Sequence, residues 1–159
     1  MDIRIGQGID FHRLEEELDL WIGGIKIPSR KGAVAHSDGD VLIHAICDAI
    51  LGAAGLKDIG HHFPDTDERF KNIDSRKLLV QTLELIGKMG FRLVNIDSTV
   101  CLEEPKINPH IDSIKKSLSG VTGLEEGRIG VKATTTEKMG FTGRGEGISA
   151  LASVLISAV

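Results

Sequence analysis

AHSDGDVLIHAICDAILGAAGLKDIGHHFPDTD, residues 35–67, combines an apolar helix pattern with four of the six histidines of the chain and six aspartates. Apolar residues recur in it at the spacing of one helix face. Ser37 or Asp38 is positioned to cap the first free N–H groups of this helix. The pattern predicts a core-facing helix, and its apolar positions are Leu42, Ala45, Ile46, Ala49, Ile50 and Ala53.

A polar stripe runs beside this apolar face. His44 lies in the first turns of the predicted helix, with Asp40 and Asp48 four residues before and after it. Residues at this spacing are neighbours on a helix. Asp48 is a candidate acceptor for a ring N–H of His44, as carboxylates often are behind a metal-ligating histidine. The stripe fits a metal ligand, and it also fits an ordinary polar helix face.

Residues 57–74, KDIGHHFPDTDERFKNID, show no period and contain Gly60, Pro64 and several aspartates, which predicts a long loop. Loops of this length in compact chains are often functional. Asp58, Asp65 and Asp67 could accept hydrogen bonds from a polyol, or they could be solvated turn residues. The histidines His61, His62 and His110 are interpreted as surface residues.

Upstream, the pattern of residues 1–9 predicts a first strand. Residues 18–29, LDLWIGGIKIPS, are predicted to form a hairpin. Asp10 and His12 follow the first strand two residues apart, so in an extended segment both side chains point to the same side. With His44 they would make three ligands and leave an open position, as in catalytic zinc sites. The alternative is an aspartate in a turn and a histidine on the surface.

Downstream, Ser75 is predicted to cap a second helix that ends near Gly90, and Asn108 and Pro109 to open a third helix that stops at Gly120. The segment 91–102 is predicted as a strand with Val94, Ile96, Val100 and Leu102 on one face, and 129–133 as a short strand. The tail after Gly147 alternates, which favours a strand over a helix. This order predicts an α/β fold of the α+β type, a single-domain sandwich (1–159) with a mixed sheet packed against helices on one side.

A second polar cluster lies in KATTTEKMGFTGRGEG, residues 132–147. Three threonines before a glycine-rich turn supply hydroxyls and N–H groups that could line a phosphate. Glu137 could bind magnesium, and Lys132, Lys138 and Arg144 add positive charge. The alternative is a strand end followed by a flexible turn.

Composition limits the partners. The net charge of −4 gives no overall attraction to nucleic acid or an anionic membrane, and 4% aromatic residues without tyrosine argue against base stacking. Cys47 and Cys101 are too few for a disulfide framework and fit a reducing compartment. No apolar run reaches the length of a membrane span, so we expect a cytoplasmic protein.

Together, GIDFHRL (8–14), residues 35–67, EEPKINPHI (103–111) and KATTTEKMGFTGRGEGI (132–148) make the chain resemble the 2-C-methyl-D-erythritol 2,4-cyclodiphosphate synthases. The resemblance implies a homotrimer with active sites between subunits. It implies a zinc ion held by Asp10, His12 and His44, and a second divalent cation, Mg²⁺ or Mn²⁺, at Glu137. The implied reaction cyclises 4-diphosphocytidyl-2-C-methyl-D-erythritol 2-phosphate and releases CMP.

The resemblance also implies site residues. His36 and Thr135 would be the catalytic residues, stabilising charge on the transferred phosphorus. The implied substrate-binding residues form two groups along the chain. The methylerythritol phosphate would lie against the His36–Ser37 turn and the loop of the first group, and the cytidine against residues 102–108 and, from the neighbouring subunit, residues 133–136 of the second. The first group is Asp10, His12, His36, Ser37, Asp58, Ile59, Gly60, Phe63, Pro64, Asp65, Thr66 and Asp67. The second group is Leu102, Glu103, Glu104, Pro105, Lys106, Ile107, Asn108, Ala133, Thr134, Thr135, Thr136, Glu137, Phe141 and Arg144.

Two alternatives remain open from the sequence. One is a metal-dependent phosphoesterase that uses a zinc-bound water, and the other is a non-catalytic metal-binding or scaffolding protein. The chain also departs from the family at Gln7, Ile9 and Leu151, where a histidine, a phenylalanine and an acidic residue are usual. The last two positions lie near a cavity on the implied trimer axis, and their departures leave open whether any ligand binds there.

Overall fold

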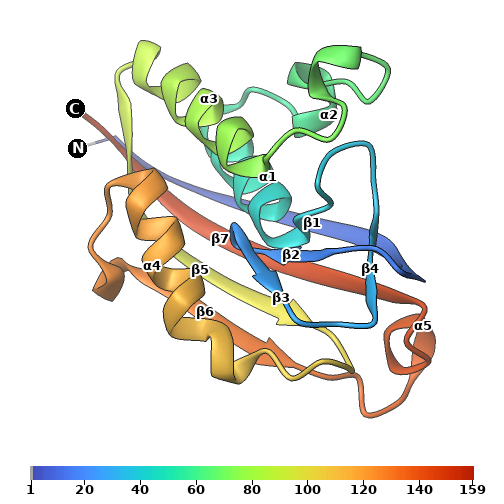
Figure 1. Ribbon diagram of the computed structural model, residues 1–159. Coiled ribbons are helices and arrows are strands. Elements are labelled where there is room, and N and C mark those ends of the chain that lie inside the picture. The colour runs from blue at the N-terminus through green and yellow to red at the C-terminus, as the bar shows by residue number, and fades with distance from the viewer. Residues whose placement is uncertain (1) are drawn as a thin grey trace.

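The computed structural model describes residues 2–159. A five-stranded sheet has the strand order β4-β1-β7-β5-β6, and β2 and β3 form a separate hairpin. Helices α1, α3 and α4 lie on one side of the large sheet (Figure 1). The strands are β1 (Ile3–Glu16), β2 (Leu20–Ile22), β3 (Ile25–Ile27), β4 (Lys31–Val34), β5 (Phe91–Cys101), β6 (Ile129–Thr134) and β7 (Gly147–Ala158). The helices are α1 (Val41–Ala54), α2 (Ile59–His62), α3 (Ser75–Lys88), α4 (Ile111–Thr122) and α5 (Gly140–Gly143), with single 3₁₀ turns η1 (Glu68–Phe70), η2 (Asn108–His110) and η3 (Glu126–Arg128).

The large sheet is mixed. Strand β1 pairs antiparallel with β7 over most of its length, and β7 pairs antiparallel with β5. Strand β5 pairs parallel with β6. The predicted α/β architecture, with a mixed sheet and helices on one side, is therefore confirmed. The predicted first strand extends well beyond residue 9 as β1, and Met1 lies outside the described residues.

Two glycines of β1 allow α1 to lie directly against the strand. A Cβ at Gly6 would lie 1.9 Å from a carbonyl oxygen of α1, and one at Gly8 would lie 2.1 Å from another. Any side chain there would push the helix outward. Since alternate residues of a strand share a face, Asp10 and His12 continue the row of these glycines and point toward the same helix.

Asp40 caps α1 and ties it to the β2–β3 hairpin. Its carboxylate accepts hydrogen bonds from the backbone N–H of Ile43 at 3.0 Å, and from those of residues 23 and 24 at 2.9 and 2.6 Å. Its side chain is fully buried. The prediction that Ser37 or Asp38 caps the helix is therefore wrong, because those side chains bond elsewhere. The hairpin itself is confirmed.

The second helix begins as predicted, but with a different cap. Asp74 accepts a hydrogen bond from the backbone N–H of Arg76 at 2.9 Å, so Asp74 is the capping residue. Ser75, predicted to be the cap, is the first helical residue, and its hydroxyl is free for another role. The helix ends at Lys88, close to the predicted end at Gly90.

The third helix is longer than predicted. Asn108 opens a 3₁₀ turn, which continues as α4 and ends at Thr122. Gly123 closes α4 with a φ of 72°. The helix therefore passes through Gly120, which the sequence interpretation took as its end.

A bulge changes the buried face of β5. The pairing with β7 shifts between Leu93 and Asn95, so Leu93 is buried and Val94 is only half-buried. The predicted position of Val94 on the core face is wrong, because a bulge places two residues opposite one and reverses the alternation. The other predicted positions of this face, Ile96, Val100 and Leu102, are buried.

The C-terminal segment forms strand β7, which confirms the strand that its alternating pattern predicted. Strand β7 lies between β1 and β5, and Ile148, Ala150, Ala152, Val154 and Ile156 are buried against the helices. The opposite face of the sheet carries exposed apolar side chains on β1 and β7, with exposed fractions of 74% at Ile5 and 51% at Ile9. Among residues 2–159, no helix has the length and apolar character needed to span a membrane.

Candidate functional site

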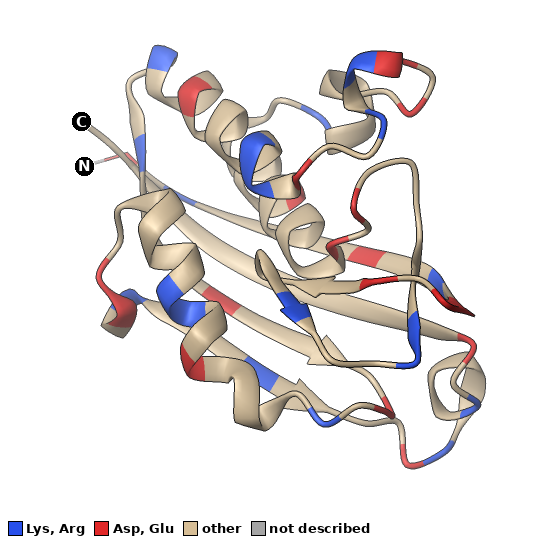
Figure 2. Ribbon diagram, in the orientation of Figure 1, with Lys and Arg blue, Asp and Glu red and all other residues tan. Residues whose placement is uncertain are grey.

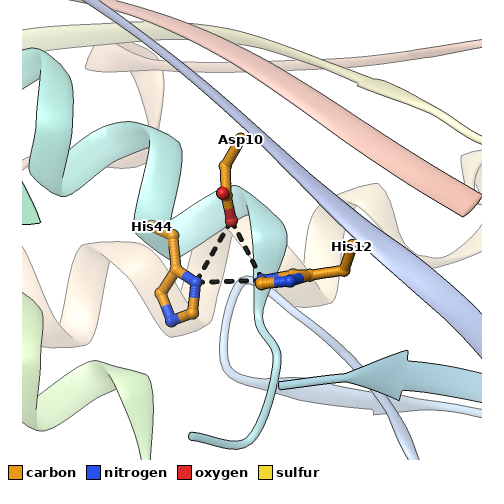
Figure 3. A group of neighbouring side chains, drawn as sticks. All are labelled: Asp10, His12 and His44. Carbon is orange, nitrogen blue, oxygen red and sulfur yellow. Dashed lines mark hydrogen bonds and ion pairs between the residues drawn. The ribbon is translucent and has the colours of Figure 1, made fainter. Parts of the chain in front are cut away.

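Asp10, His12 and His44 form a compact group, named here the metal corner, in which β1 supplies the first two residues and α1 the third (Figure 3). One ligand atom from each lies within 4.8 Å of the other two. His12 Nε2 lies 3.0 Å from Asp10 Oδ2 and 3.1 Å from His44 Nδ1, and His44 Nδ1 lies 3.2 Å from Asp10 Oδ2. All three atoms face a common point.

The rest of the His44 ring is held by hydroxyl groups. His44 Nε2 lies 2.9 Å from Ser75 Oγ and 3.1 Å from Ser37 Oγ. Asp48, which the helix pattern suggested as the partner, instead accepts a hydrogen bond from the backbone N–H of Ile59 at 2.7 Å. The predicted pairing of Asp48 with His44 is therefore wrong, because Asp48 holds the start of α2.

Charge and burial act in opposite directions at the metal corner. Burial alone would raise the pKa of Asp10, but hydrogen bonds from His12 and His44 outweigh it and hold that pKa well below its usual value. Burial alone would lower the pKa of His44, but the hydrogen bond and charge of Asp10 outweigh it and raise that pKa. The corner therefore favours an anionic Asp10 beside a positive charge.

The residues present fit a divalent cation. One carboxylate oxygen and two imidazole nitrogens converge from β1 and α1. Their lone pairs face one another, and a shared proton or a cation between them relieves the repulsion. Two histidines and a carboxylate form a donor set found in catalytic zinc sites, where three protein ligands leave one position open. The exposed fractions of these side chains, 25% for Asp10 and 10% for His44, leave one side accessible.

A cavity of about 410 Å³ opens beside the metal corner. His12 and His44 line one part of it, and His36 and Ser37 line another. His36 Nε2 donates a hydrogen bond to the carbonyl oxygen of Asp67 at 3.1 Å, which fixes the ring at the cavity edge. The predicted loop of residues 57–74, named here the polyol loop, adds Ile59, Gly60, Phe63, Asp65, Phe70 and Ile73 to the wall, and Ala35 and Leu78 complete it.

The other residues predicted from this loop do not line that cavity. Asp58 caps α2 through the backbone N–H of His61 at 2.8 Å. Asp67 pairs with Arg69 at 2.6 Å, and the hydrogen bonds from Arg69 lower the pKa of Asp67. Pro64 and Thr66 lie in the connecting turn. The segment predicted as an irregular loop contains two single helical turns, α2 and η1.

A second cavity, of about 740 Å³, lies at the α5 end of the sheet. Its wall includes Glu103, Glu104, Pro105 and Lys106 from the predicted cytidine-binding stretch, and Arg144, another predicted substrate-binding residue. Figure 2 shows acidic and basic residues interspersed at this end of the molecule. One carboxylate oxygen of Glu103 is buried without a hydrogen-bond partner among residues 2–159.

Residues 134–140, named here the threonine turn, connect β6 to α5. The backbone N–H of Leu102 donates to the carbonyl oxygen of Thr134 at 3.0 Å, which joins the two predicted cytidine-binding stretches. Glu137 and Lys138 adopt φ angles of 53° and 64°, unusual for residues with a side chain. The carboxylate of Glu137 is exposed.

Within residues 2–159, no residue of the threonine turn lines the cavity beside the metal corner. The two cavities share no lining residue. Glu137 belongs to no group of three potential metal ligands in the described part of the chain. The remaining predicted residues of the second group are buried (Leu102, Ile107), half-buried (Ala133, Thr135, Thr136) or exposed (Asn108, Thr134, Phe141).

The sequence interpretation missed Ser75 and Asp38 as neighbours of the corner. Ser75 is separated from His44 by more than thirty residues, and its place at a helix start suggested a cap. The two elements meet only because α3 packs beside α1 (Figure 1). No spacing rule in a single sequence predicts that contact.

Comparison with known families decides the relationship. The family model described as the YgbB family matches residues 3–157. The chain belongs to the YgbB family. A family match over nearly the whole chain confirms the resemblance that the sequence motifs indicated, and it covers the metal corner, both cavities and the threonine turn.

Similar proteins carry a uniform name. The chain is 58% identical to the 2-C-methyl-D-erythritol 2,4-cyclodiphosphate synthase of Parabacteroides distasonis, over 98% of this chain and 97% of that protein. It is 55% identical to the synthase of the same name from Bacteroides fragilis, over the full length of both. Because synthases of this kind are lyases, the prediction that the chain is an enzyme of this family is confirmed.

A solved structure supports the same relationship. The chain superposes with a TM-score of 0.90 on a 2C-methyl-D-erythritol-2,4-cyclodiphosphate synthase described as a bound form with CDP. That protein is 41% identical to this chain, and the match covers 97% of this chain and 100% of that one. The fold therefore agrees with that of a nucleotide-binding member of the family.

Proposed function

We propose that this chain converts 4-diphosphocytidyl-2-C-methyl-D-erythritol 2-phosphate to 2-C-methyl-D-erythritol 2,4-cyclodiphosphate and CMP. The observation that carries the proposal is the single cavity in which the metal corner meets His36, Ser37 and the polyol loop. One wall of it suits phosphate and the other a small polyol. The names of the relatives and the CDP-bound structural neighbour support the nucleotide part.

The reaction needs little acid–base chemistry from the chain. An oxygen of the 2-phosphate attacks the β-phosphorus, and the bond from that phosphorus to the oxygen shared with the α-phosphate breaks, which releases CMP. The attacking oxygen is already anionic near neutral pH. Orientation of the two phosphates and stabilisation of their charge are therefore the main tasks of the protein.

The residues of the first cavity would perform the orientation. Gly60 and Phe63 leave room for the methylerythritol carbons, and Asp65 accepts hydrogen bonds from its hydroxyls. The hydroxyl of Ser37 is placed to donate a hydrogen bond to the phosphate oxygens at the other end. The Nε2 hydrogen of His36 is held by the carbonyl oxygen of Asp67, so His36 would donate to phosphate from Nδ1 as an imidazolium. A bent substrate held at both ends brings the 2-phosphate toward the β-phosphorus.

Metal ions would contribute charge. Asp10, His12 and His44 would hold Zn²⁺, and Glu137 a second divalent cation, Mg²⁺ or Mn²⁺. Such cations neutralise the phosphate oxygens and so lower the barrier to attack by another anion. Thr135 is proposed to donate a hydrogen bond to the transferred phosphoryl group from the threonine turn.

The active site is proposed to be completed by a neighbouring copy of the chain in a homotrimer. No residue of the threonine turn lines the cavity beside the metal corner within residues 2–159, although the proposed reaction needs both regions. The open face of the sheet also exposes apolar side chains that a monomer would leave in water, Ile3, Ile5, Ile9, Phe11 and Leu151. Burial of this face between copies is proposed to form the trimer, in which a neighbouring copy would supply its threonine turn to the corner.

Identification of the product tests the reaction. Incubation with the cytidyl substrate in ¹⁸O-labelled water, followed by ³¹P NMR and mass spectrometry, is expected to yield CMP and an unlabelled cyclic diphosphate. His44→Ala is expected to lose both bound zinc and turnover. A linear product that carries ¹⁸O would instead identify a phosphoesterase and refute the proposal.

Mixed assemblies test the shared site. His44→Ala and Thr135→Ala are each expected to be inactive alone, because one damages the corner and the other the turn. In a randomly mixed trimer, about a quarter of the sites would pair an intact corner with an intact turn. Recovery of about that share of activity is expected after the two variants are unfolded and refolded together. No recovery, with trimers verified by native mass spectrometry, would mean that each site lies within one chain.

A further inference from the structure

Ser75 forms a hydrogen-bonded chain with Asp38 and His44 behind the metal corner. Ser75 Oγ lies 2.5 Å from Asp38 Oδ1 and 2.9 Å from His44 Nε2. The backbone N–H of Ser75 donates to Asp38 Oδ2 at 2.9 Å. Ser75 is fully buried, so water does not compete for its hydroxyl.

The donors and acceptors of this chain have only one consistent order. An ionised carboxylate only accepts hydrogen bonds, so the single hydroxyl hydrogen of Ser75 is donated to Asp38. Ser75 Oγ can then only accept from His44, and His44 Nε2 must carry the hydrogen. The other ring nitrogen, Nδ1, keeps its lone pair for the point shared with Asp10 and His12.

Asp38 is itself fixed in place by the backbone. Its N–H donates to the carbonyl oxygen of Ile73 at 3.1 Å, and its carboxylate accepts from the N–H of Asp40 at 3.1 Å. The hydroxyl of Ser37 also lies near His44 Nε2, at 3.1 Å, but no carboxylate fixes the direction of its hydrogen. Ser75 is therefore the group that determines which His44 nitrogen is protonated.

We infer that Ser75, held by Asp38, is a positioning residue that fixes the His44 ring and presents its Nδ1 to the cation of the metal corner. This inference rests on the metal site of the proposed function. Partners behind a metal ligand typically change metal affinity tenfold to a hundredfold when they are removed. Ser75 does not touch the substrate cavity, so its effect would pass through His44.

Zinc affinity, measured by competition with a chelator, gives the first test. Ser75→Ala is expected to weaken zinc binding by about tenfold to a hundredfold. Ser98→Ala is the matched control, because Ser98 is also a buried serine, 2% exposed, whose hydroxyl donates to the carbonyl oxygen of Gly130 at 2.8 Å. Ser75→Ala loses two side-chain hydrogen bonds and Ser98→Ala loses one, so both variants should melt at lowered temperatures, Ser75→Ala the lower of the two. Ser98→Ala should nevertheless bind zinc like the wild type.

The ring nitrogens of His44 give a readout that a purely structural role would not change. In the zinc-loaded wild type, ¹⁵N NMR is expected to show Nδ1 bound to zinc and Nε2 carrying hydrogen. Ser75→Thr keeps a hydroxyl and is expected to recover zinc affinity toward the wild-type value. Coordination through Nε2, or equal zinc affinity in the wild type and Ser75→Ala, would overturn the inference.

Separate outcomes apply to the proposed function. If zinc binds through His44 and weakens in Ser75→Ala, but the product is linear, the cyclisation proposal fails and the role of Ser75 stands. If the wild type cyclises its substrate and Ser75→Ala binds zinc equally well, the role of Ser75 fails alone. Zinc binding that survives His44→Ala would remove both the metal corner and the inference.

Discussion

The metal corner and the threonine turn show two ways of holding functional groups. The corner is built from the middle of β1 and the first turns of α1, with its side chains largely buried and supported by hydroxyls from the same chain. The turn follows the end of β6, an edge strand, and the hydrogen bonds of its threonine hydroxyls are local. The corner is therefore complete within one chain, whereas the turn offers its groups outward.

This difference indicates a division of work. Groups that must converge on one ion within a few tenths of an ångström are placed on rigid, tightly packed elements. Groups that meet a large substrate, or a neighbouring subunit, are placed on a turn at the edge of the sheet. Changes that damage one region should therefore leave the other intact, and substitutions can test that independence.

Gly8→Ala is expected to have the largest effect. The new Cβ would lie 2.1 Å from a backbone oxygen of α1, so the helix that carries His44 must move away from β1. Overpacking of this kind costs about 3 kcal/mol of unfolding free energy. Urea unfolding and zinc competition should show both lower stability and weaker zinc binding.

Gly52→Ala is the matched control for Gly8→Ala, because Gly52 lies on α1, the helix that Gly8→Ala would displace. Its Cβ would meet no atom closer than 3.8 Å. Alanine in a helix interior is expected to stabilise by about 0.5–1 kcal/mol relative to glycine, with zinc affinity unchanged. If Gly8→Ala were as stable as the wild type, the close packing of α1 on β1 would not be what positions the corner.

Gly143→Ala applies the same test to the threonine turn. A Cβ at Gly143 would lie 2.1 Å from the backbone carbonyl carbon of Lys138, so the turn must change its path. Turnover is expected to fall by about tenfold or more, because a displaced donor loses its alignment with the substrate. Stability should fall by about 2 kcal/mol, and zinc affinity should not change.

The control for Gly143→Ala is Gly120→Ala, since a Cβ there would meet no atom within 4 Å. It should leave turnover and zinc affinity as they are. Zinc binding that weakened in Gly143→Ala would contradict the separation of the two regions.

The contrast also explains what the sequence could predict. Asp10 and His12 share a strand face, and His44 lies on a helix with a clear apolar stripe, so local periodicity was enough to nominate the three residues. Their convergence depends on two glycines in β1, whose role becomes visible only when α1 is seen to lie against them.

Errors arose where contacts join distant segments or where one extra residue changes a pattern. Asp48 has helical spacing from His44, but its partner is the N–H of Ile59. The true partner, Ser75, comes from another helix. The bulge at Leu93–Asn95 moved Val94 off the core face, and strand alternation contains no signal for such an insertion.

Lys138→Gly tests the strain in the threonine turn. Lys138 has a φ of 64°, which costs a residue with a side chain more than it costs glycine. Part of the gain is offset by the greater freedom of glycine in the unfolded chain, so we expect about 0.5 kcal/mol of added stability. Zinc affinity should not change.

Glu17→Gly is the matched control for Lys138→Gly, because Glu17 has a φ of 63° outside both regions. It should gain stability in the same way, as measured by urea unfolding, without any change in turnover. Lower stability in Lys138→Gly would show that contacts of the lysine side chain, and not its backbone, dominate at this position.

The smallest effect is expected at Asp74, which caps the helix that supports the metal corner. The hydrogen bonds from Arg76 hold the pKa of Asp74 below its usual value. A carboxylate with a lowered folded-state pKa stabilises the fold above its unfolded pKa of about 4, and this contribution is lost as pH falls through the folded pKa. Because the pair is partly exposed, solvent screening limits the contribution to about 0.5 kcal/mol.

Asp74→Asn isolates that charge, since asparagine caps a helix about as well as aspartate. Urea unfolding of the apo protein at several pH values should show the variant less stable near pH 6, with the difference shrinking as pH falls below about 4. A difference that stayed constant across this range would assign the effect to the shape of the cap and not to its charge. In that case α3 would support the metal corner through its packing and the Ser75 hydroxyl, and the Asp74–Arg76 ion pair would contribute nothing.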